Sequence, residues 1–201
     1  NGKVTLRYSP FKPLIFRASA STCFRAPSLG PSWFSAVSTN FLSVNGTVQP
    51  FDVLTAPVSS PIAVALGAQP LRPETSRNLS GGVVWNPISN LEMTADFFHI
   101  DIKHRIVLSG NFTQAQVQPL LQPFGATGAR FFTNAIDTRT NGYDLVLTHQ
   151  RPLFSGRIDL SAAYSNTKTS IVHIAPTPLQ FTGLRSVLFD RADPLSVPTG
   201  Q

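Results

Sequence analysis

Residues 91–105, LEMTADFFHIDIKHR, alternate between apolar and polar side chains, but the alternation changes phase halfway along the segment. The apolar residues stand at odd positions from Leu91 to Phe97 and at even positions from Phe98 to Ile102. Side chains of a β-strand point alternately to its two faces, so the pattern predicts one long strand. It also predicts that the two faces of this strand exchange their apolar and polar character next to Phe97.

The composition of the chain favours an all-β protein. Only 13% of its 201 residues are charged, and it contains 17 prolines and 15 phenylalanines. This charged fraction is about half that of an ordinary globular protein, whereas turn formers and β-formers are abundant. The formal net charge is +6, but the lysines and arginines are scattered singly, so we expect no nucleic-acid partner. A single cysteine, Cys23, excludes a disulfide or a thiolate metal site within the chain.

Alternating segments recur along the chain, and the connections between them are short and long in turn. The short connections are SPFKP (9–13), NPISN (86–90) and RPLFSG (151–156), and the long ones cover roughly 27–72 and 106–130. Connections as long as the latter two are rare in compact domains. A meander with tight turns at one end and long loops at the other is the layout of an outer-membrane β-barrel. A β-sandwich, the alternative all-β fold, gives no reason to sort its loops by length.

Three further expectations concern local structure and the ends of the chain. A short helix that starts near Asn111 or Thr113 is predicted within FTQAQVQPLLQ (112–122), and irregular structure from about Thr167 onward. No stretch approaches the ~18 continuous apolar residues of a transmembrane helix, which does not exclude barrel strands. The start, NGKVTLRYSP, has neither an initiator Met nor a signal peptide, and the end is a polar tail. We therefore expect the chain to be a piece of a longer protein.

Six aromatic side chains fall on the apolar faces of their strands, in two groups. A strand tilted by ~40° climbs about 2.5 Å per residue, so a ~25 Å apolar band needs about ten residues. The two groups are separated by about this length, as expected for the girdles at the two membrane interfaces. The opposite face carries polar side chains and is expected to line a lumen. The girdle residues are Tyr8, Phe24, Trp85, Phe97, Tyr143 and Tyr164, and the lumen-facing residues are Arg7, Arg17, Glu92, Asp96, Asp144, Arg157 and Asp159.

Four segments carry motifs that recur together in one family. ASASTCFRAPSL (18–29) contains an FRAPSL-type motif, and LRPETSRNLSGGVVWNP (71–87) contains L-x-P-E-x-S. LEMTADFFHIDIKHRIVLSGNFT (91–113) contains aromatic-x-I-x-I-x-x-R-I, and ARFFTNAIDTRTNGYDLVL (129–147) contains T-N-A followed by G-x-D. In this order the four segments resemble the β-barrel of TonB-dependent outer-membrane receptors.

The resemblance implies an antiparallel meander that forms part of a transmembrane barrel of about 22 strands, with short periplasmic turns and long extracellular loops. In such receptors a plug domain fills the barrel, and the TonB complex acts on a TonB box. The implied function is TonB-dependent uptake of a scarce solute, most readily a ferric siderophore, with cobalamin or a carbohydrate as alternatives. We expect residues 1–201 to be a partial barrel without plug or TonB box. The implied partners are outer-membrane lipid, the receptor's own plug domain, the TonB complex and the extracellular solute.

The sequence contains no recognisable catalytic constellation. Its four histidines lack metal-ligand spacing, and no serine stands in a G-x-S-x-G context. Glu92 and Asp96 share a strand face but lie over ~12 Å apart, too far for a pair of catalytic carboxylates. We therefore expect neither enzymatic activity nor a cofactor or metal. Solute contacts are expected from the long loops and strand tops, where the candidates are Arg25, Arg105 and Arg130.

A glycine pair interrupts the alternating segment that precedes residue 86. Gly81 and Gly82 lie inside a predicted strand, where glycine has no side chain to pack. Glycine inside a strand often marks a close approach by another part of the molecule. We expect a plug or a neighbouring backbone to approach the sheet at this pair.

Two other classes of protein fit parts of the pattern. A passive porin or an autotransporter-type barrel has the same strand layout, and an upstream plug domain with a TonB box distinguishes a receptor from both. A soluble β-rich adhesin or binding module is the third alternative. Such a module is soluble without detergent, whereas a lipid-facing band requires detergent.

On the barrel interpretation, the phase reversal in the opening segment marks the edge of the membrane. Residues 91–97 cross the bilayer with their odd face toward lipid, and Phe97 lies at the outer interface. Beyond Phe97 the same face meets water, where the polar residues His99, Asp101 and Lys103 are acceptable. This hypothesis predicts a strand without a bulge between Phe97 and Phe98.

Overall fold

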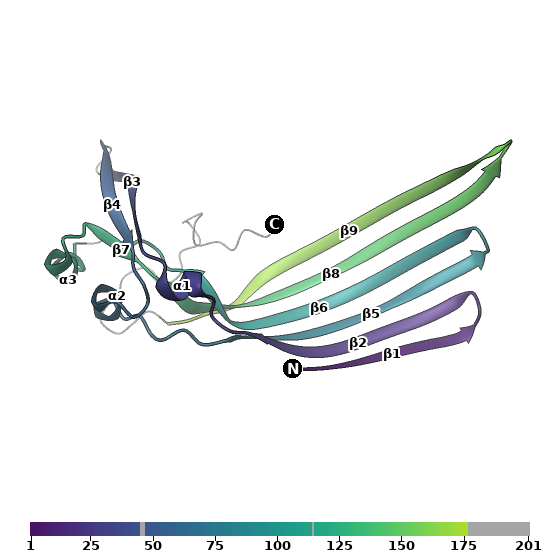
Figure 1. Cartoon of the computed structure of the whole chain (residues 1–201), viewed down its shortest axis with the longest axis horizontal. Coiled ribbons are helices and arrows are strands. Elements are labelled where there is room, and N and C mark those ends of the chain that lie inside the picture. Colours follow the sequence, from purple (N-terminus) through teal and green to yellow (C-terminus); the bar gives the residue numbers. More distant parts are fainter. Residues whose placement is uncertain (45–46, 114, 177–201) are drawn as a thin grey trace.

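Six long antiparallel strands form a single sheet in the computed structural model, which describes residues 1–44, 47–113 and 115–176 (Figure 1). The strands follow one another across the sheet in the order of the chain, so each pairs with its neighbour in the meander. The all-β, antiparallel fold class is therefore confirmed. In spatial order the strands are β1 (Gly2–Phe11), β2 (Leu14–Arg25), β5 (Glu74–Ile88), β6 (Leu91–Leu108), β8 (Phe132–Leu153) and β9 (Gly156–Ile174).

The predicted alternation of short and long connections is confirmed. Two-residue turns at 12–13, 89–90 and 154–155 join β1 to β2, β5 to β6 and β8 to β9 at one end of the sheet. The long connections, 26–73 and 109–131, leave from the opposite end (Figure 1). All short turns therefore lie on one side and both long loops on the other.

One local prediction is wrong, and another is confirmed with a different starting residue. Strand β9 runs to Ile174 instead of ending near Thr167, because its backbone continues to pair with β8 up to Ile136. Backbone hydrogen bonds hold a strand together where the side chains no longer alternate, which explains why the pattern missed this part. In the second long connection the predicted short helix is present but begins later than predicted: α3 covers Gln118–Leu121 and is followed by the 3-10 helix η1 at Gln122–Phe124.

The phase reversal in β6 occurs without a bulge. The pairing of β6 with β5 is continuous from Met93 to Lys103, and its pairing with β8 is continuous from Leu91 to Ile102. Phe97 and Phe98 consequently point to opposite faces, as the hypothesis predicted. Register shifts in β6 come later, between Ile102 and Ile106, where His104 has a left-handed φ of 56°.

The turns are staggered along the sheet, as in a tilted-strand barrel. Leu14, Trp85, Met93 and Leu147 lie in one row of paired residues. The β1–β2 turn begins at this row, whereas the β8–β9 turn begins six residues beyond it, at Leu153. A shift of six residues over three to four strands corresponds to a strand tilt of roughly 45–55°, close to the ~35–45° of membrane barrels. Figure 1 shows the same progression, from the β1–β2 turn to the β8–β9 turn.

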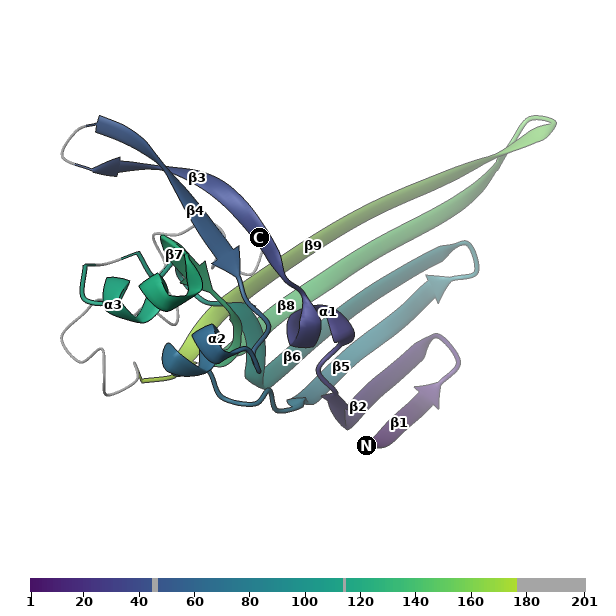
Figure 2. The same ribbon diagram turned by 60° about the vertical axis from the view of Figure 1, so that its left-hand side comes forward.

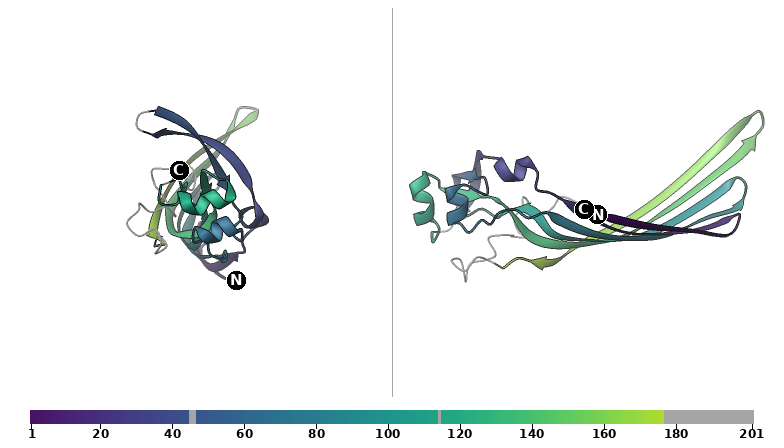
Figure 3. Two further views of the ribbon diagram at one scale, coloured as in Figure 1. Left: turned by 90° about the vertical axis from the view of Figure 1, so that its left-hand side faces the viewer. Right: turned by 60° about the horizontal axis from the view of Figure 1, so that its bottom comes forward.

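The long connections fold into a separate layer beyond one end of the sheet, which we call the loop layer (residues 26–44, 47–73, 109–113 and 115–131) (Figures 2 and 3). Its three-stranded sheet has the order β3-β4-β7, in which β4 and β7 run parallel. The sequence did not predict this sheet. Besides α3 and η1, the layer contains β3 (Ala36–Val44), β4 (Thr47–Thr55), β7 (Gly128–Arg130), α1 (Leu29–Trp33) and α2 (Pro61–Ala65).

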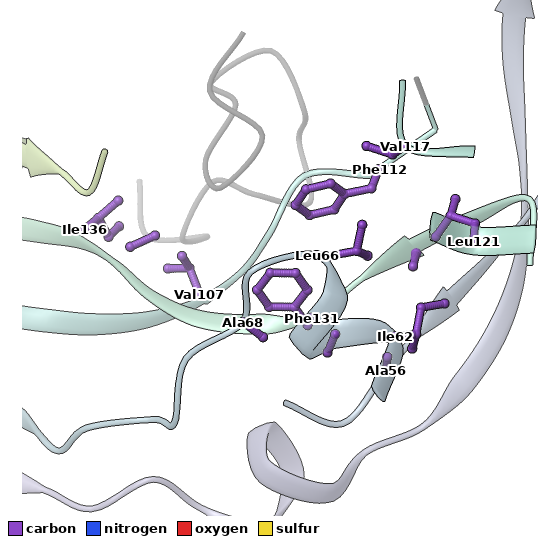
Figure 4. Close-up of a cluster of buried hydrophobic side chains, with 13 residues drawn as sticks. Ala56, Ile62, Leu66, Ala68, Val107, Phe112, Val117, Leu121, Phe131 and Ile136 are labelled. Carbon is purple, nitrogen blue, oxygen red and sulfur yellow. The ribbon is translucent and has the colours of Figure 1, made fainter. Parts of the chain in front are cut away.

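The buried apolar core of the described residues lies in and beneath the loop layer (Figure 4). Phe112 and Phe131 stack with their ring centroids 5.5 Å apart, and Leu66 and Leu121 are fully buried beside them. These residues come from both long connections, so the core fastens the two loops to each other. Of the helices in the described part of the chain, none is both long and apolar enough to cross a membrane.

The six-stranded sheet has the opposite character, since many of its apolar side chains lie at the surface. Leu6, Leu79 and Leu160 are 66%, 55% and 59% exposed, and they belong to three different strands. Monomeric soluble proteins rarely expose a contiguous apolar patch larger than a few hundred Å². The sheet therefore requires an apolar environment that the chain itself does not supply.

Candidate functional site

The register places all seven predicted lumen residues on one face of the sheet, which we call the charged face. Arg7, Arg17, Asp96 and Asp144 lie in a single row across β1, β2, β6 and β8. The other three residues stand an even number of positions from this row, nearer to the turns, and therefore share its face. They are Glu92, Arg157 and Asp159. Whether this face lines a lumen stays a prediction.

An ion pair crosses the charged face over a glycine. Arg17 on β2 donates from Nε to Oδ1 of Asp96 on β6 at 2.8 Å, and a second bond joins the same two groups. The intervening strand β5 contributes Gly82 to this row. A β-carbon at Gly82 would lie 1.9 Å from Asp96 Oδ1, so only glycine leaves room for the pair. The close approach predicted at the glycine pair is thus made here by a side chain of the same sheet.

Three of the other charged side chains of the charged face also have partners within the sheet. Arg157 pairs with Asp159 at 3.0 Å, and Ser165 donates a hydrogen bond of 2.6 Å to Asp144. Exposed pairs of this kind contribute little to stability, about 0–1 kcal/mol each. Their effect is to neutralise opposite charges along the face and to hold the side chains in position.

Two of the recognised motifs meet on the same face. Phe98, the aromatic residue of the third motif, pairs with Gly142, the glycine of the fourth. A β-carbon at Gly142 would lie 2.2 Å from Cζ of Phe98, so the ring lies over the glycine backbone. A large aromatic side chain covering a cross-strand glycine stabilises a pair that glycine alone would weaken.

At the loop end of the sheet, the Glu74 carboxylate joins the first three motifs. Glu74 is 7% exposed, and its Oε1 accepts a 2.7 Å hydrogen bond from the backbone N–H of Ile106. Its Oε2 lies 3.1 Å from Nε of Arg25. Glu74 belongs to L-x-P-E-x-S, Arg25 to the FRAPSL-type motif and Ile106 to the R-I end of the third motif. This buried carboxylate therefore satisfies a main-chain donor and an arginine at once.

The fourth motif closes the same junction through Asn134. Its Oδ1 accepts from the backbone N–H of Arg72 at 2.8 Å, and its Nδ2 donates to the backbone oxygens of Arg72 and His104. The N–H of His104 in turn donates to Asp137 at 2.8 Å. At the irregularity in β6, both the N–H and the carbonyl of His104 are therefore bound by side chains of β8, as expected of a structural bulge. We call the contacts of Glu74 and Asn134 the junction.

A cavity of about 520 Å³ opens beside the junction. Its polar lining comes from the strand ends and from the segment that follows α2, and sequence reasoning did not identify it. No three His, Cys, Asp or Glu side chains in the described part of the chain are arranged to hold a metal ion. The polar residues at its wall are Gln69, Arg72, His104, Thr133, Asn134, Asp137 and His173.

The opposite face, which we call the aromatic face, carries all six predicted girdle residues. The rings of Phe97, Tyr143 and Tyr164 form a continuous row, with centroid separations of 6.1 Å and 5.9 Å. The register places the remaining three, Tyr8, Phe24 and Trp85, on the same face. That they lie at the two interfaces of a membrane stays a prediction.

Beyond this ring row the aromatic face becomes polar. One ring nitrogen of His99 lies 2.6 Å from Oδ1 of Asn141, and the other lies 3.1 Å from Oδ2 of Asp101. Arg139 donates from its Nε to Oδ1 of Asp101 at 2.8 Å. The hydrogen bond with Asn141, followed by that with Asp101, raises the pKa of His99 above its ordinary value. The hydrogen bond from Arg139, followed by that from His99, lowers the pKa of Asp101. The hydrogen bonds of this cluster therefore favour the protonated form of His99 and the ionised form of Asp101.

Comparison with known families matches the chain to the TonB dependent receptor-like, beta-barrel family over residues 1–188. The chain belongs to this family. No curated protein sequence matches it. The TonB-dependent receptor family consists of outer-membrane transport proteins, which agrees with a sheet that carries one apolar and one charged face.

The three arginines predicted to contact solute each bind a different partner in this receptor barrel. Arg25 pairs with Glu74, and Arg105 donates to Thr138 at 3.4 Å. Arg130 donates to Thr55 at 2.8 Å and to Ser38 at 3.2 Å, which ties β7 to the β3–β4 hairpin. Their common contribution in the structure is to fasten loops and strands. A role in solute binding stays a prediction for all three.

Replacing Gly82 tests the ion pair that crosses it. Gly82→Ala is expected to displace Asp96 and to destabilise the barrel by about 1–3 kcal/mol, the usual cost of overpacking. Gly81→Ala is the matched control, because a β-carbon there meets only the Arg17 backbone oxygen at 3.9 Å. Denaturant unfolding of the detergent-solubilised receptor measures both. Equal stabilities of the two variants would contradict the assigned role of Gly82.

Replacing Glu74 tests the junction. Glu74→Ala leaves the Ile106 N–H without its acceptor, so we expect a loss of about 1–3 kcal/mol. Limited proteolysis should then cut faster in the loop layer, whose ends the junction holds. Glu92→Ala, which removes an exposed carboxylate from the same sheet, serves as the control. A Glu74→Ala barrel as resistant to protease as this control would show that the junction is dispensable.

The hydrogen bonds of His99 give stability a dependence on pH. Because its pKa is raised in the folded protein, the contribution of His99 is present below its ordinary pKa of 6.5 and is lost as pH rises through the folded value. His99→Gln should therefore lower the melting temperature at pH 5 and have little effect at pH 9. NMR titration of the imidazole should show a lower pKa in Asn141→Leu. An unchanged pKa in that variant would exclude Asn141 as the main cause.

Proposed function

We propose that the chain is part of the wall of a TonB-dependent outer-membrane receptor that takes up a ferric siderophore. The observation that carries the proposal is the family match over residues 1–188. The separation of charged and aromatic side chains on the two faces of the sheet supports the same placement. Residues 1–201 would then be part of a barrel of about 22 strands, with the charged face toward a lumen that holds the plug domain.

The arrangement of the long loops supports an extracellular binding role. Both long connections leave the same end of the sheet and share one apolar core, so they form a single ordered surface instead of two independent loops. Binding residues are commonly found on loops that a rigid scaffold positions. We propose that the solute contacts this layer, with Arg25, Arg105 and Arg130 as candidate contacts.

Uptake measurements test the proposed function. A bacterial strain that expresses the intact receptor should accumulate an iron-labelled siderophore, and the accumulation should stop when its TonB complex is inactivated. Labelled cobalamin and oligosaccharides, offered in parallel, test the alternative solutes. Uptake that persists without the TonB complex would identify a passive pore. Failure of all solutes to accumulate above a receptor-deletion strain would overturn the proposal of active uptake.

A substitution in the loop layer tests the solute contacts. Arg130→Lys keeps the positive charge but loses the forked geometry that binds Thr55 and Ser38 together, whereas Arg130→Gln also loses the charge. If Arg130 contacts an acidic solute, uptake should fall further in the Gln variant than in the Lys variant. Equal losses in the two would assign Arg130 a structural role only.

A further inference from the structure

The aromatic face carries a belt of cations directly beyond its ring row. Arg77, Lys103, Arg139 and Lys168 come from four different strands, and the register places all four on this face. Two carboxylates lie near them on this face: Asp101 binds Arg139 and His99, and Asp137, two residues along β8 from Arg139, accepts from the backbone N–H of His104. In the same part of the chain, no acidic side chain pairs with Arg77 or Lys168.

A hollow of about 800 Å³ leads from the apolar part of this face to the belt. Its floor consists of small residues, Ala18, Ala20 and Gly81, while Leu6 and Phe97 stand at its sides in the same rows. Lys168 and His99 lie at its polar end, together with Asn141. The hollow therefore has an apolar body and a cationic end, on the face that the aromatic girdle identifies as lipid-facing.

We propose that this hollow binds a phosphate-bearing lipid, with an acyl chain over Ala18, Ala20 and Gly81 and the phosphate against Lys168 and His99. The inference rests on the membrane placement in the proposed function. Charge complementarity indicates an anionic headgroup, because a permanent negative charge at the polar end of the hollow lies near Lys168. Arg77 adds a second positive charge in the adjacent row of the same face. The small floor residues select a flexible apolar chain, which can fill a shallow depression that a bulky side chain cannot enter.

The proposed site differs from the non-specific lipid contacts of a membrane protein because its headgroup-binding side chains are held in position. The hydrogen bonds of His99 with Asn141 and Asp101 hold its ring in one position, and the pairing of Arg139 with Asp101 holds that guanidinium beside it. The headgroup therefore meets an imidazole and a guanidinium that are held in fixed positions, besides the mobile lysine, which lowers the entropy cost of binding.

Native mass spectrometry of the intact receptor in detergent tests the proposal. The probes are dimyristoyl-phosphatidylglycerol, which carries a net negative phosphate, and dimyristoyl-phosphatidylcholine, which has the same chains and no net charge. The unaltered receptor should retain phosphatidylglycerol preferentially. Lys168→Gln and Arg77→Gln should each lower this preference about fivefold, as expected for one cation near an anionic headgroup.

Two further variants separate the chain contact from charge alone. Gly81→Leu fills the floor of the hollow, where a β-carbon has room, and should lower the retention of both lipids. Lys3→Gln is the matched control, because Lys3 lies at the same level on the charged face. Lys3→Gln should leave the retention of both lipids unchanged. If Lys3→Gln lowered the preference for phosphatidylglycerol as much as Lys168→Gln does, the proposed site would be overturned.

The outcomes also separate this proposal from the proposed function. A membrane-embedded receptor that shows no preference for phosphatidylglycerol overturns the lipid site alone. A receptor that fractionates with soluble proteins overturns the membrane placement and the lipid site together. Normal solute uptake by Lys168→Gln with reduced lipid retention supports a lipid site that is separate from transport.

Discussion

The buried carboxylate of Glu74 holds the boundary between the sheet and the loop layer. Through Arg25 and the N–H of Ile106 it joins β2, β5 and β6 where their regular pairing ends. Asn134 adds β8 to the same point by binding the backbone of Arg72 and His104. Because a buried carboxylate is costly unless paired and hydrogen-bonded, this arrangement fixes how the strands end. The strand ends from which both long loops leave, and which border the cavity, are held at this point.

The two faces of the sheet could be predicted from the sequence because strand periodicity is a local property. The alternation within each strand assigned the girdle and lumen residues to the faces on which the register places them. The phase reversal needed no bulge, since the strand keeps its faces while the side chains on each change character. The end of β9 was missed for the same reason: beyond the ring row its side chains no longer show an apolar alternation, although the backbone pairing continues.

The loop layer and the junction could not be predicted, because their contacts join residues far apart in the sequence. Phe112 and Phe131 belong to a core shared by both long connections, and neither connection has a periodic pattern of its own. The motifs containing Glu74 and Asn134 were recognised, but nothing in the sequence indicated that both side chains bind the backbone of β6. Likewise, glycine at position 82 predicted a close approach without identifying Asp96 as the group that approaches.

The parallel pairing of β4 with β7 has a consequence for the order of folding. Val53 pairs with Gly128 across a long stretch of chain, and between them lie the whole of β5 and β6. Closing a loop of this length costs chain entropy. This cost is lower once β5 and β6 have paired, because their pairing brings the two ends of the loop closer together. Hairpins with two-residue turns form from contacts that are close in the sequence and need no such help. The hairpins of the six-stranded sheet should therefore assemble first, and the loop layer should be the last part of the chain to acquire its structure.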